Sequence, residues 1–103
     1  MRFYEMTAPE IRQLDRRRVI VVAPIAACEQ HGPHLPTFTD TILVTAVAEG
    51  VERRLPERVL LLPTLWLGAS HHHLRFGGTL SAGVDTHVDV LCDLAESVLN
   101  DGF

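Results

Sequence analysis

The segment from Cys28 to Asp40, CEQHGPHLPTFTD, gathers metal-ligand and proton-transfer side chains into a short stretch of chain. It contains Glu29, His31, His34 and Asp40. Glu29 and His31 are two residues apart, and alternate residues of an extended backbone point the same way, so both side chains can face one centre. One imidazole with two carboxylates is a donor set that suits a hydrolytic Zn²⁺ or Mn²⁺ site.

Asp40 lies where the next helix is expected to begin. The first N–H groups of a helix orient a carboxylate without neutralising it. Between two metal ions roughly 3.5–4 Å apart, this carboxylate would bridge them, with a bridging hydroxide as nucleophile. The spacing leaves a second interpretation open, in which Asp40 is a plain helix N-cap and His31 and His34 are hydrogen-bonded loop histidines.

The flanking elements place this segment at the carboxyl end of a strand. Residues 19–27 form a continuous apolar run, typical of a strand buried on both faces, and residues 58–67 form a second. Helices are expected over three segments: 7–14, 39–55 and 84–98. Glycine and histidine between 68 and 83 indicate a loop. Alternating strands and helices favour an α/β fold with parallel strands, in which ligands bind at the carboxyl ends of the strands.

The predicted topology is unfinished, because the chain stops after a helix where a third strand is expected. Two parallel strands between three helices make a poor sheet. We therefore expect residues 1–103 to be a single, incomplete domain, truncated after its third helix. The sheet edge left without a neighbour should be apolar, which predicts a homo-oligomer.

The composition of the chain argues against several classes of protein. The 103 residues are 47% hydrophobic and 21% charged, with a formal net charge of −4, which is typical of a globular domain and gives no general attraction to nucleic acid. No apolar run approaches the roughly 20 residues that span a bilayer. The N-terminal segment lacks the apolar core of a signal peptide. Cys28 and Cys92 form no paired motif, which favours free thiols and a cytoplasmic location.

Two long motifs resemble those of the creatininase (creatinine amidohydrolase) family. Residues 24–36, PIAACEQHGPHLP, followed by a Thr-Asp pair at 39–40, resemble P-x-G-S-x-E-Q-H-G-P-H-L-P followed by T-D. Residues 68–81, GASHHHLRFGGTLS, resemble G-x-S-x-x-H-x-x-F-P-G-T-L-S. The departures are Ala26 and Ala27 in place of Gly-Ser, and Gly77 in place of Pro.

The resemblance implies an amidohydrolase on a three-layer αβα sandwich, usually oligomeric, with two Zn or Mn ions per complete site. By position, Glu29 binds one metal, His31 the other, and Asp40 bridges them. His73 matches the histidine of the second motif and is the candidate catalytic residue at the rim of the site. The expected reaction is attack of a metal-bound hydroxide on the carbonyl carbon of a cyclic or linear amide, such as creatinine, a formylamino-pyrimidine or a peptide.

His34 and Gln30 are expected to contact the small-molecule substrate or to orient a neighbouring residue by a hydrogen bond. The family's third element, N-G-H-x-E/G-N, is expected after the last helix and is absent from these 103 residues. An alternative function is therefore a non-catalytic truncated chain that binds metal weakly or not at all and acts only through oligomer assembly.

Two further alternatives concern single features. Adjacent side chains diverge in an extended backbone, so His71, His72 and His73 are not expected to bind one ion together. Cys28 beside an acidic residue and near two histidines suggests a thiol nucleophile. A cysteine that ends a buried strand is more often part of the packing, and no oxyanion-hole motif accompanies it.

Overall fold

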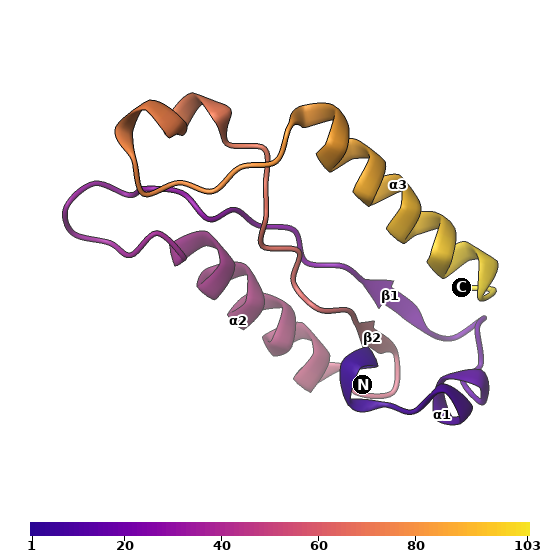
Figure 1. Cartoon of the computed structure of the whole chain (residues 1–103). Helices are drawn as coiled ribbons and strands as arrows, with labels where there is room; N and C mark the ends of the chain where they lie inside the picture. Colours follow the sequence, from indigo (N-terminus) through magenta and orange to yellow (C-terminus); the bar gives the residue numbers. More distant parts are fainter.

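A two-stranded parallel sheet lies between two long helices in the computed structural model, which describes residues 1–103 (Figure 1). The elements, in chain order, are η1 (Phe3–Glu5), α1 (Ala8–Arg12), β1 (Ile20–Val22), α2 (Thr39–Arg54), β2 (Val59–Leu61), η2 (His71–Phe76) and α3 (Val84–Asn100). β1 pairs with β2 in parallel, with Val21 opposite Leu60. The predicted α/β class with parallel strands is confirmed.

The two faces of β2 pack against different helices, because successive strand residues point to opposite sides. Val59 and Leu61 form a small buried core with Ala48 of α2. Leu60 and Leu62 lie on the other face, toward α3. An apolar cavity between the sheet and α3 is lined by Phe3, Val21, Leu60, Leu62, Leu94 and Val98. The sheet is thus the middle layer of three.

β1 is shorter and more exposed than its apolar run predicts. The expected strand covers residues 19–27, whereas β1 spans three residues, and Ile20 is 57% exposed. The regular ladder stops at Pro24, which has no N–H to donate, and resumes as a single bridge between Ile25 and Leu65. The prediction of a strand buried on both faces is therefore wrong for β1. It is confirmed for β2, whose three residues are all buried.

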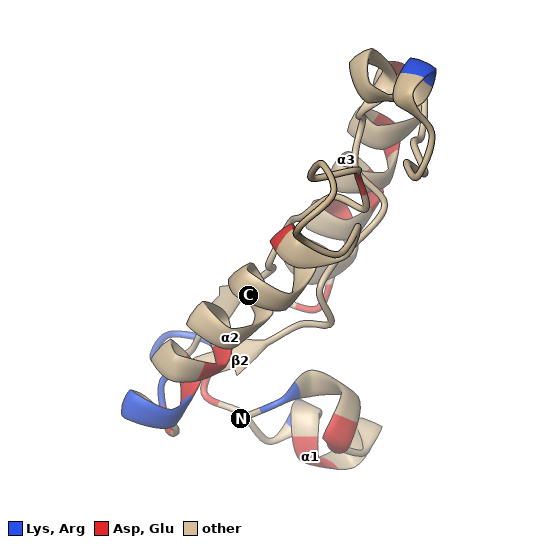
Figure 2. Cartoon of the chain, turned by 90° about the vertical axis from the view of Figure 1, so that its left-hand side faces the viewer, with Lys and Arg blue, Asp and Glu red and all other residues tan.

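Apolar side chains remain exposed on β1, on the segment that follows it and on α3. They include Ile20, Ile25, Val84, Val88, Val90 and Leu99. This surface agrees with the expectation of an oligomer, which stays a prediction. None of the helices combines the length and the apolar character that crossing a bilayer requires. Figure 2 shows arginines gathered at the end of the molecule where α2 ends, with Arg53 and Arg54 in its last turn.

The segments that leave the two strands run side by side. The Ala26 N–H donates to the Leu65 carbonyl at 2.9 Å, and the Leu80 N–H donates to the Cys28 carbonyl at 2.9 Å. The Thr41 hydroxyl of α2 donates to the Ala27 carbonyl at 2.8 Å. These bonds fix the loop after β1 against both the segment after β2 and the start of α2. Within the predicted loop 68–83, the structure forms the 3-10 helix η2.

Gly68 allows this close approach, and adding a methyl group there should destabilise the fold. A Cβ at position 68 would lie 2.8 Å from the Ala26 carbonyl oxygen. We expect Gly68→Ala to lower the free energy of unfolding by about 1–3 kcal/mol, as overpacking does. The same change in the α2 interior, Gly50→Ala, meets only ordinary contacts and should raise it by about 0.5–1 kcal/mol. Urea unfolding followed by circular dichroism measures the free energy of unfolding of both variants. Equal changes in the two variants would contradict a special requirement for glycine at position 68.

The buried carboxylate of Glu52 ties the N-terminal residues to the end of α2. One oxygen accepts a hydrogen bond from the Met1 ammonium at 2.7 Å, and the other lies 3.7 Å from the Arg2 guanidinium. The bond from the ammonium, aided by both positive charges, lowers the pKa of Glu52 below its ordinary value of 4.5. The ionised form is therefore favoured in the folded protein.

A pKa lowered by folding stabilises the fold above the unfolded-state pKa, and this contribution is lost as the pH falls through the folded value. We expect Glu52→Gln to lower the unfolding free energy by about 2 kcal/mol at neutral pH, because a charged hydrogen bond is lost. The difference from wild type should shrink below about pH 4.5. Glu57→Gln, an exposed change in the following turn, is the control. Parallel stability curves for wild type and Glu52→Gln between pH 3 and 7 would refute the prediction.

Candidate metal centre

Three side chains from two elements converge at the carboxyl end of β1. Glu29 and His31 lie in the loop after the strand, and Asp40 lies in the first turn of α2. One potential ligand atom from each lies within 4.8 Å of the other two. The His31 Nε2 is 3.3 Å from an Asp40 carboxylate oxygen. All three residues are half-buried, so the group opens to solvent on one side.

The loop that carries Glu29 and His31 is closed by its own backbone. The Glu29 N–H donates to the Thr37 carbonyl at 2.9 Å, which joins the two ends of the loop. Gly32 has φ +67°, a left-handed conformation that a residue with a side chain rarely adopts. Pro33 and Pro36 restrict the backbone that follows. This closure brings Glu29 and His31 close to Asp40, which follows the loop in α2.

A backbone carbonyl fixes the orientation of the His31 ring. Its Nδ1 lies 2.9 Å from the Glu29 carbonyl oxygen, which only accepts, so Nδ1 carries the proton. This hydrogen bond, together with the negative charges of Asp40 and Glu29, raises the pKa of His31. In the neutral ring, the unprotonated Nε2 faces Asp40. That arrangement, with one ring nitrogen held by a carbonyl and the other free, is typical of metal-binding histidines.

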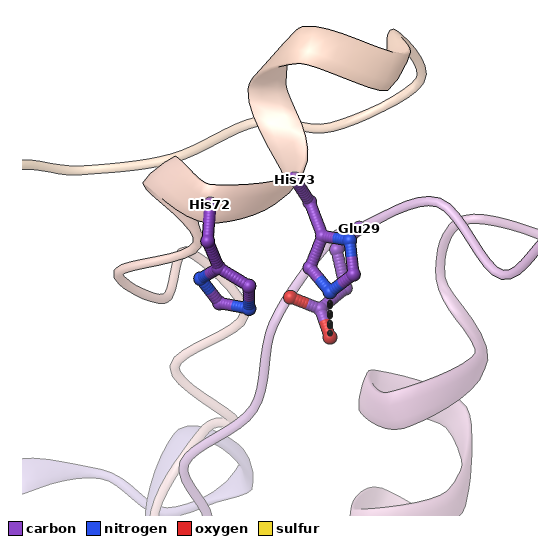
Figure 3. A group of neighbouring side chains, drawn as sticks. All are labelled: Glu29, His72 and His73. Carbon is purple, nitrogen blue, oxygen red and sulfur yellow. Dashed lines mark ion pairs between the residues drawn. The ribbon is translucent and has the colours of Figure 1, made fainter.

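A second group shares Glu29 with two histidines of η2 (Figure 3). The His73 Nε2 lies 3.9 Å from a Glu29 carboxylate oxygen. The rings of His72 and His73 lie 4.3 Å apart, centre to centre. From the sequence, His72 was not expected to share an ion with His73, because adjacent side chains diverge in an extended chain. Residues 71–76 form a 3-10 helix and not an extended chain, so this divergence does not apply here. Both rings lie near the same carboxylate.

Three other residues named from the sequence belong to neither group. His34 is exposed on the loop and belongs to neither group. His71 is exposed, and its Nδ1 lies 3.1 Å from the Ser81 hydroxyl. Cys28 is a buried free thiol, 8% exposed, whose backbone pairs with Leu80. This burial favours packing for Cys28 rather than the nucleophile role.

Gln30 connects the two loops. Its side-chain nitrogen lies 3.0 Å from the His73 Nδ1, and its backbone N–H donates to the Thr79 hydroxyl at 3.1 Å. The sequence suggested that Gln30 orients a neighbour, without indicating which one. It missed Thr79, whose only signal was its place in the second motif.

The donors of Glu29, His31 and Asp40 fit a divalent cation. Hydrolytic zinc sites commonly use three protein ligands and leave a further position for water or substrate. Here two carboxylates and one imidazole nitrogen, held in its ligating tautomer, lie close enough together to surround one ion. The partial exposure leaves one side of the group accessible. The chemistry of the donor set therefore agrees with a single hydrolytic cation.

Comparisons with known proteins also indicate a hydrolase. The family model described as "Creatininase: Creatinine amidohydrolase" matches residues 4–103. The chain is 38% identical over 101 residues to the "Mycofactocin precursor peptide peptidase" of Mycobacterium tuberculosis, covering 90% of this chain and 40% of that protein. It is 31% identical over 102 residues to the "3-dehydro-scyllo-inosose hydrolase" of Thermotoga maritima, covering 98% of this chain and 32% of that one.

Solved structures confirm the predicted type of fold. A mutant creatininase complexed with creatine superimposes with a TM-score of 0.86 at 27% identity, covering 98% of this chain and 40% of that one. A second creatinine amidohydrolase superimposes with a TM-score of 0.83. The chain corresponds to part of an αβα fold, and it spans about 40% or less of the length of these relatives.

Proposed function

The chain belongs to the creatininase family of hydrolases, and from this membership we propose that it acts as a metal-dependent amidohydrolase on the C–N bond of a cyclic or linear amide. The observation that carries the proposal is the convergence of Glu29, His31 and Asp40. The relatives named above are, by their names, a peptidase, an inosose hydrolase and a creatininase. The higher identity to the peptidase favours a peptide-like amide.

Glu29, His31 and Asp40 are proposed to hold the cation. A bound Zn²⁺ or Mn²⁺ would supply Lewis-acid activation of the amide carbonyl and of the attacking water. The Glu29 carbonyl keeps His31 in the tautomer that leaves Nε2 free. The helix position of Asp40 orients its carboxylate toward the same centre. A second cation bridged by Asp40 remains an expectation from the family resemblance.

His73 is proposed to contact the substrate. Hydrolysis joins a water oxygen to the carbonyl carbon, breaks the C–N bond and moves one water proton to the leaving nitrogen. Negative charge develops on the carbonyl oxygen in between, and a fixed hydrogen-bond donor stabilises it. His73 lies beside Glu29 at the edge of the group and could supply such a donor from the second loop. His34 and Gln30 are proposed to contact the substrate or to support this arrangement.

Three further expectations belong to this proposal. The apolar residues exposed on β1 and α3 support a homo-oligomer. The free thiols of Cys28 and Cys92 support a cytoplasmic location. The family resemblance supports Zn or Mn as the native metal.

A second candidate is a non-catalytic chain that binds metal weakly or not at all. It is favoured by one observation, that the group of Glu29, His31 and Asp40 offers only three ligand residues. Three donors suffice for one ion, but a complete dinuclear site needs more ligands than these. In this alternative the chain acts through assembly with other chains.

Product analysis by mass spectrometry separates the two candidates. The purified chain, with Zn²⁺ or Mn²⁺ added, is incubated with creatinine, a short peptide and a formylamino-pyrimidine. Amide hydrolysis that requires added metal and disappears in Asp40→Asn supports the enzyme. Weak or absent metal binding, together with no turnover of any of the three compounds, supports the non-catalytic chain. Hydrolysis that is unaffected by metal removal would overturn the proposed mechanism.

A further inference from the structure

We infer that Gln30 is a positioning residue that keeps the proton of the neutral His73 ring on Nε2. His73 then faces Glu29 as a hydrogen-bond donor and not as a metal ligand. The position of the proton follows from local hydrogen bonds alone. The role of this His73 N–H in amide hydrolysis rests on the function proposed above.

The first step is the orientation of the Gln30 side chain. The Gly32 N–H lies 2.9 Å from the Gln30 side-chain oxygen. A backbone N–H can only donate, so the amide must present its oxygen there and its NH₂ group elsewhere. The left-handed conformation of Gly32, with φ +67°, belongs to the turn that brings this N–H back toward Gln30. The amide is thereby fixed in one of its two orientations.

The second step is the tautomer of His73. With its oxygen engaged, Gln30 presents the NH₂ group to the His73 Nδ1 at 3.0 Å. An NH₂ group donates, so Nδ1 must accept. A neutral imidazole has one acceptor and one donor nitrogen, which leaves the proton on Nε2. The bond from the Gln30 backbone to Thr79 holds the two loops in this register.

The third step concerns what His73 can do. Its Nε2 lies 3.9 Å from the Glu29 carboxylate, too far for a direct hydrogen bond, so the N–H is available to a third group placed between them. Metal binding through Nε2 would require the proton to move to Nδ1, where it would face the NH₂ group of Gln30. Two donors would then face each other. His73 is therefore a hydrogen-bond donor in the group with Glu29 and His72, and Glu29 remains free for the group with His31 and Asp40.

Nuclear magnetic resonance of the histidine ring nitrogens tests this inference without metal or substrate. The 103-residue chain is labelled with ¹⁵N and measured at about pH 8, where histidine is ordinarily neutral. The His73 signals are assigned by their loss in His73→Gln. We expect the form protonated on Nε2 to exceed the other by roughly fivefold, as one hydrogen bond of ordinary strength implies.

Gln30→Glu reverses the hydrogen-bond pattern at nearly constant shape. One carboxylate oxygen still accepts from Gly32, while the other now faces Nδ1 as an acceptor. A proton should therefore appear on the His73 Nδ1. Gln13→Glu, the same change at an exposed position, should leave the spectrum of His73 unchanged. The inference is overturned if wild-type His73 carries its proton on Nδ1, or if a folded Gln30→Glu variant keeps the wild-type tautomer.

The outcome is separate from that of the proposed function. A chain that shows the expected tautomer but hydrolyses no amide keeps the inference and loses the function. A chain that hydrolyses an amide with His73 protonated on Nδ1 keeps the proposed function and loses the inference about Gln30.

Discussion

Replacing Asp40 with Asn is expected to weaken the binding of Zn²⁺ or Mn²⁺ by about 100-fold or more. The substitution keeps the size of the side chain and removes the charge that faces the His31 Nε2 at 3.3 Å. Even the loss of a hydrogen-bond partner behind a ligand typically costs 10–100-fold in metal affinity, so the loss of a ligand charge should cost at least the upper value. Isothermal titration of the metal-free chain measures the effect.

Asp85→Asn is the matched control for this experiment. Asp85 is the second residue of α3, as Asp40 is of α2, and it is exposed. Both variants lose one negative charge at the same position of a helix, but only Asp40 faces the candidate centre. Equal affinities for the two variants would show that the loss of net charge, and not a ligand, explains any weakening.

Leu61→Ala is expected to lower the free energy of unfolding by about 3 kcal/mol. Leu61 is 2% exposed and packs with Ala48 and Val59 in the core between α2 and β2. Replacing a buried leucine with alanine removes apolar contact and leaves a cavity, at a cost of about 2–5 kcal/mol. Domains of this size are commonly stable by about 5–15 kcal/mol, so the loss is a large share of the total.

Leu43→Ala provides the comparison, since Leu43 on α2 is 60% exposed. Its effect should lie within about 0.5 kcal/mol of zero. Urea unfolding followed by circular dichroism gives both values. A cost at Leu61 no larger than at Leu43 would contradict the placement of the core between α2 and β2.

The elements with strong local signals could be predicted from the sequence. The apolar run at residues 58–67 predicts a buried strand, and the structure buries residues 59–62 of this run, with β2 shorter than predicted. The start of α2 at Thr39 and the expected helix over 84–98 also agree with the observed elements. Glu29 and His31 were expected to face one centre, and the structure brings them together with Asp40.

The remaining features depend on residues far apart in the chain. The exposure of Ile20 reflects which strands and helices lie beside β1, and an apolar run carries no such information. The contact of Gln30 with His73 joins residues 43 apart, brought together by the pairing of two loops. His72 approaches Glu29 only because η2 is a 3-10 helix, where the sequence predicted an irregular loop.

Anomalous diffraction from crystals grown with Mn²⁺ is the most direct test of the central claim that Glu29, His31 and Asp40 hold the cation. We predict a peak about 2.0–2.2 Å from the His31 Nε2 and from one carboxylate oxygen of each acidic residue. A peak between Glu29, His72 and His73 instead, or none at saturating Mn²⁺, would contradict the account.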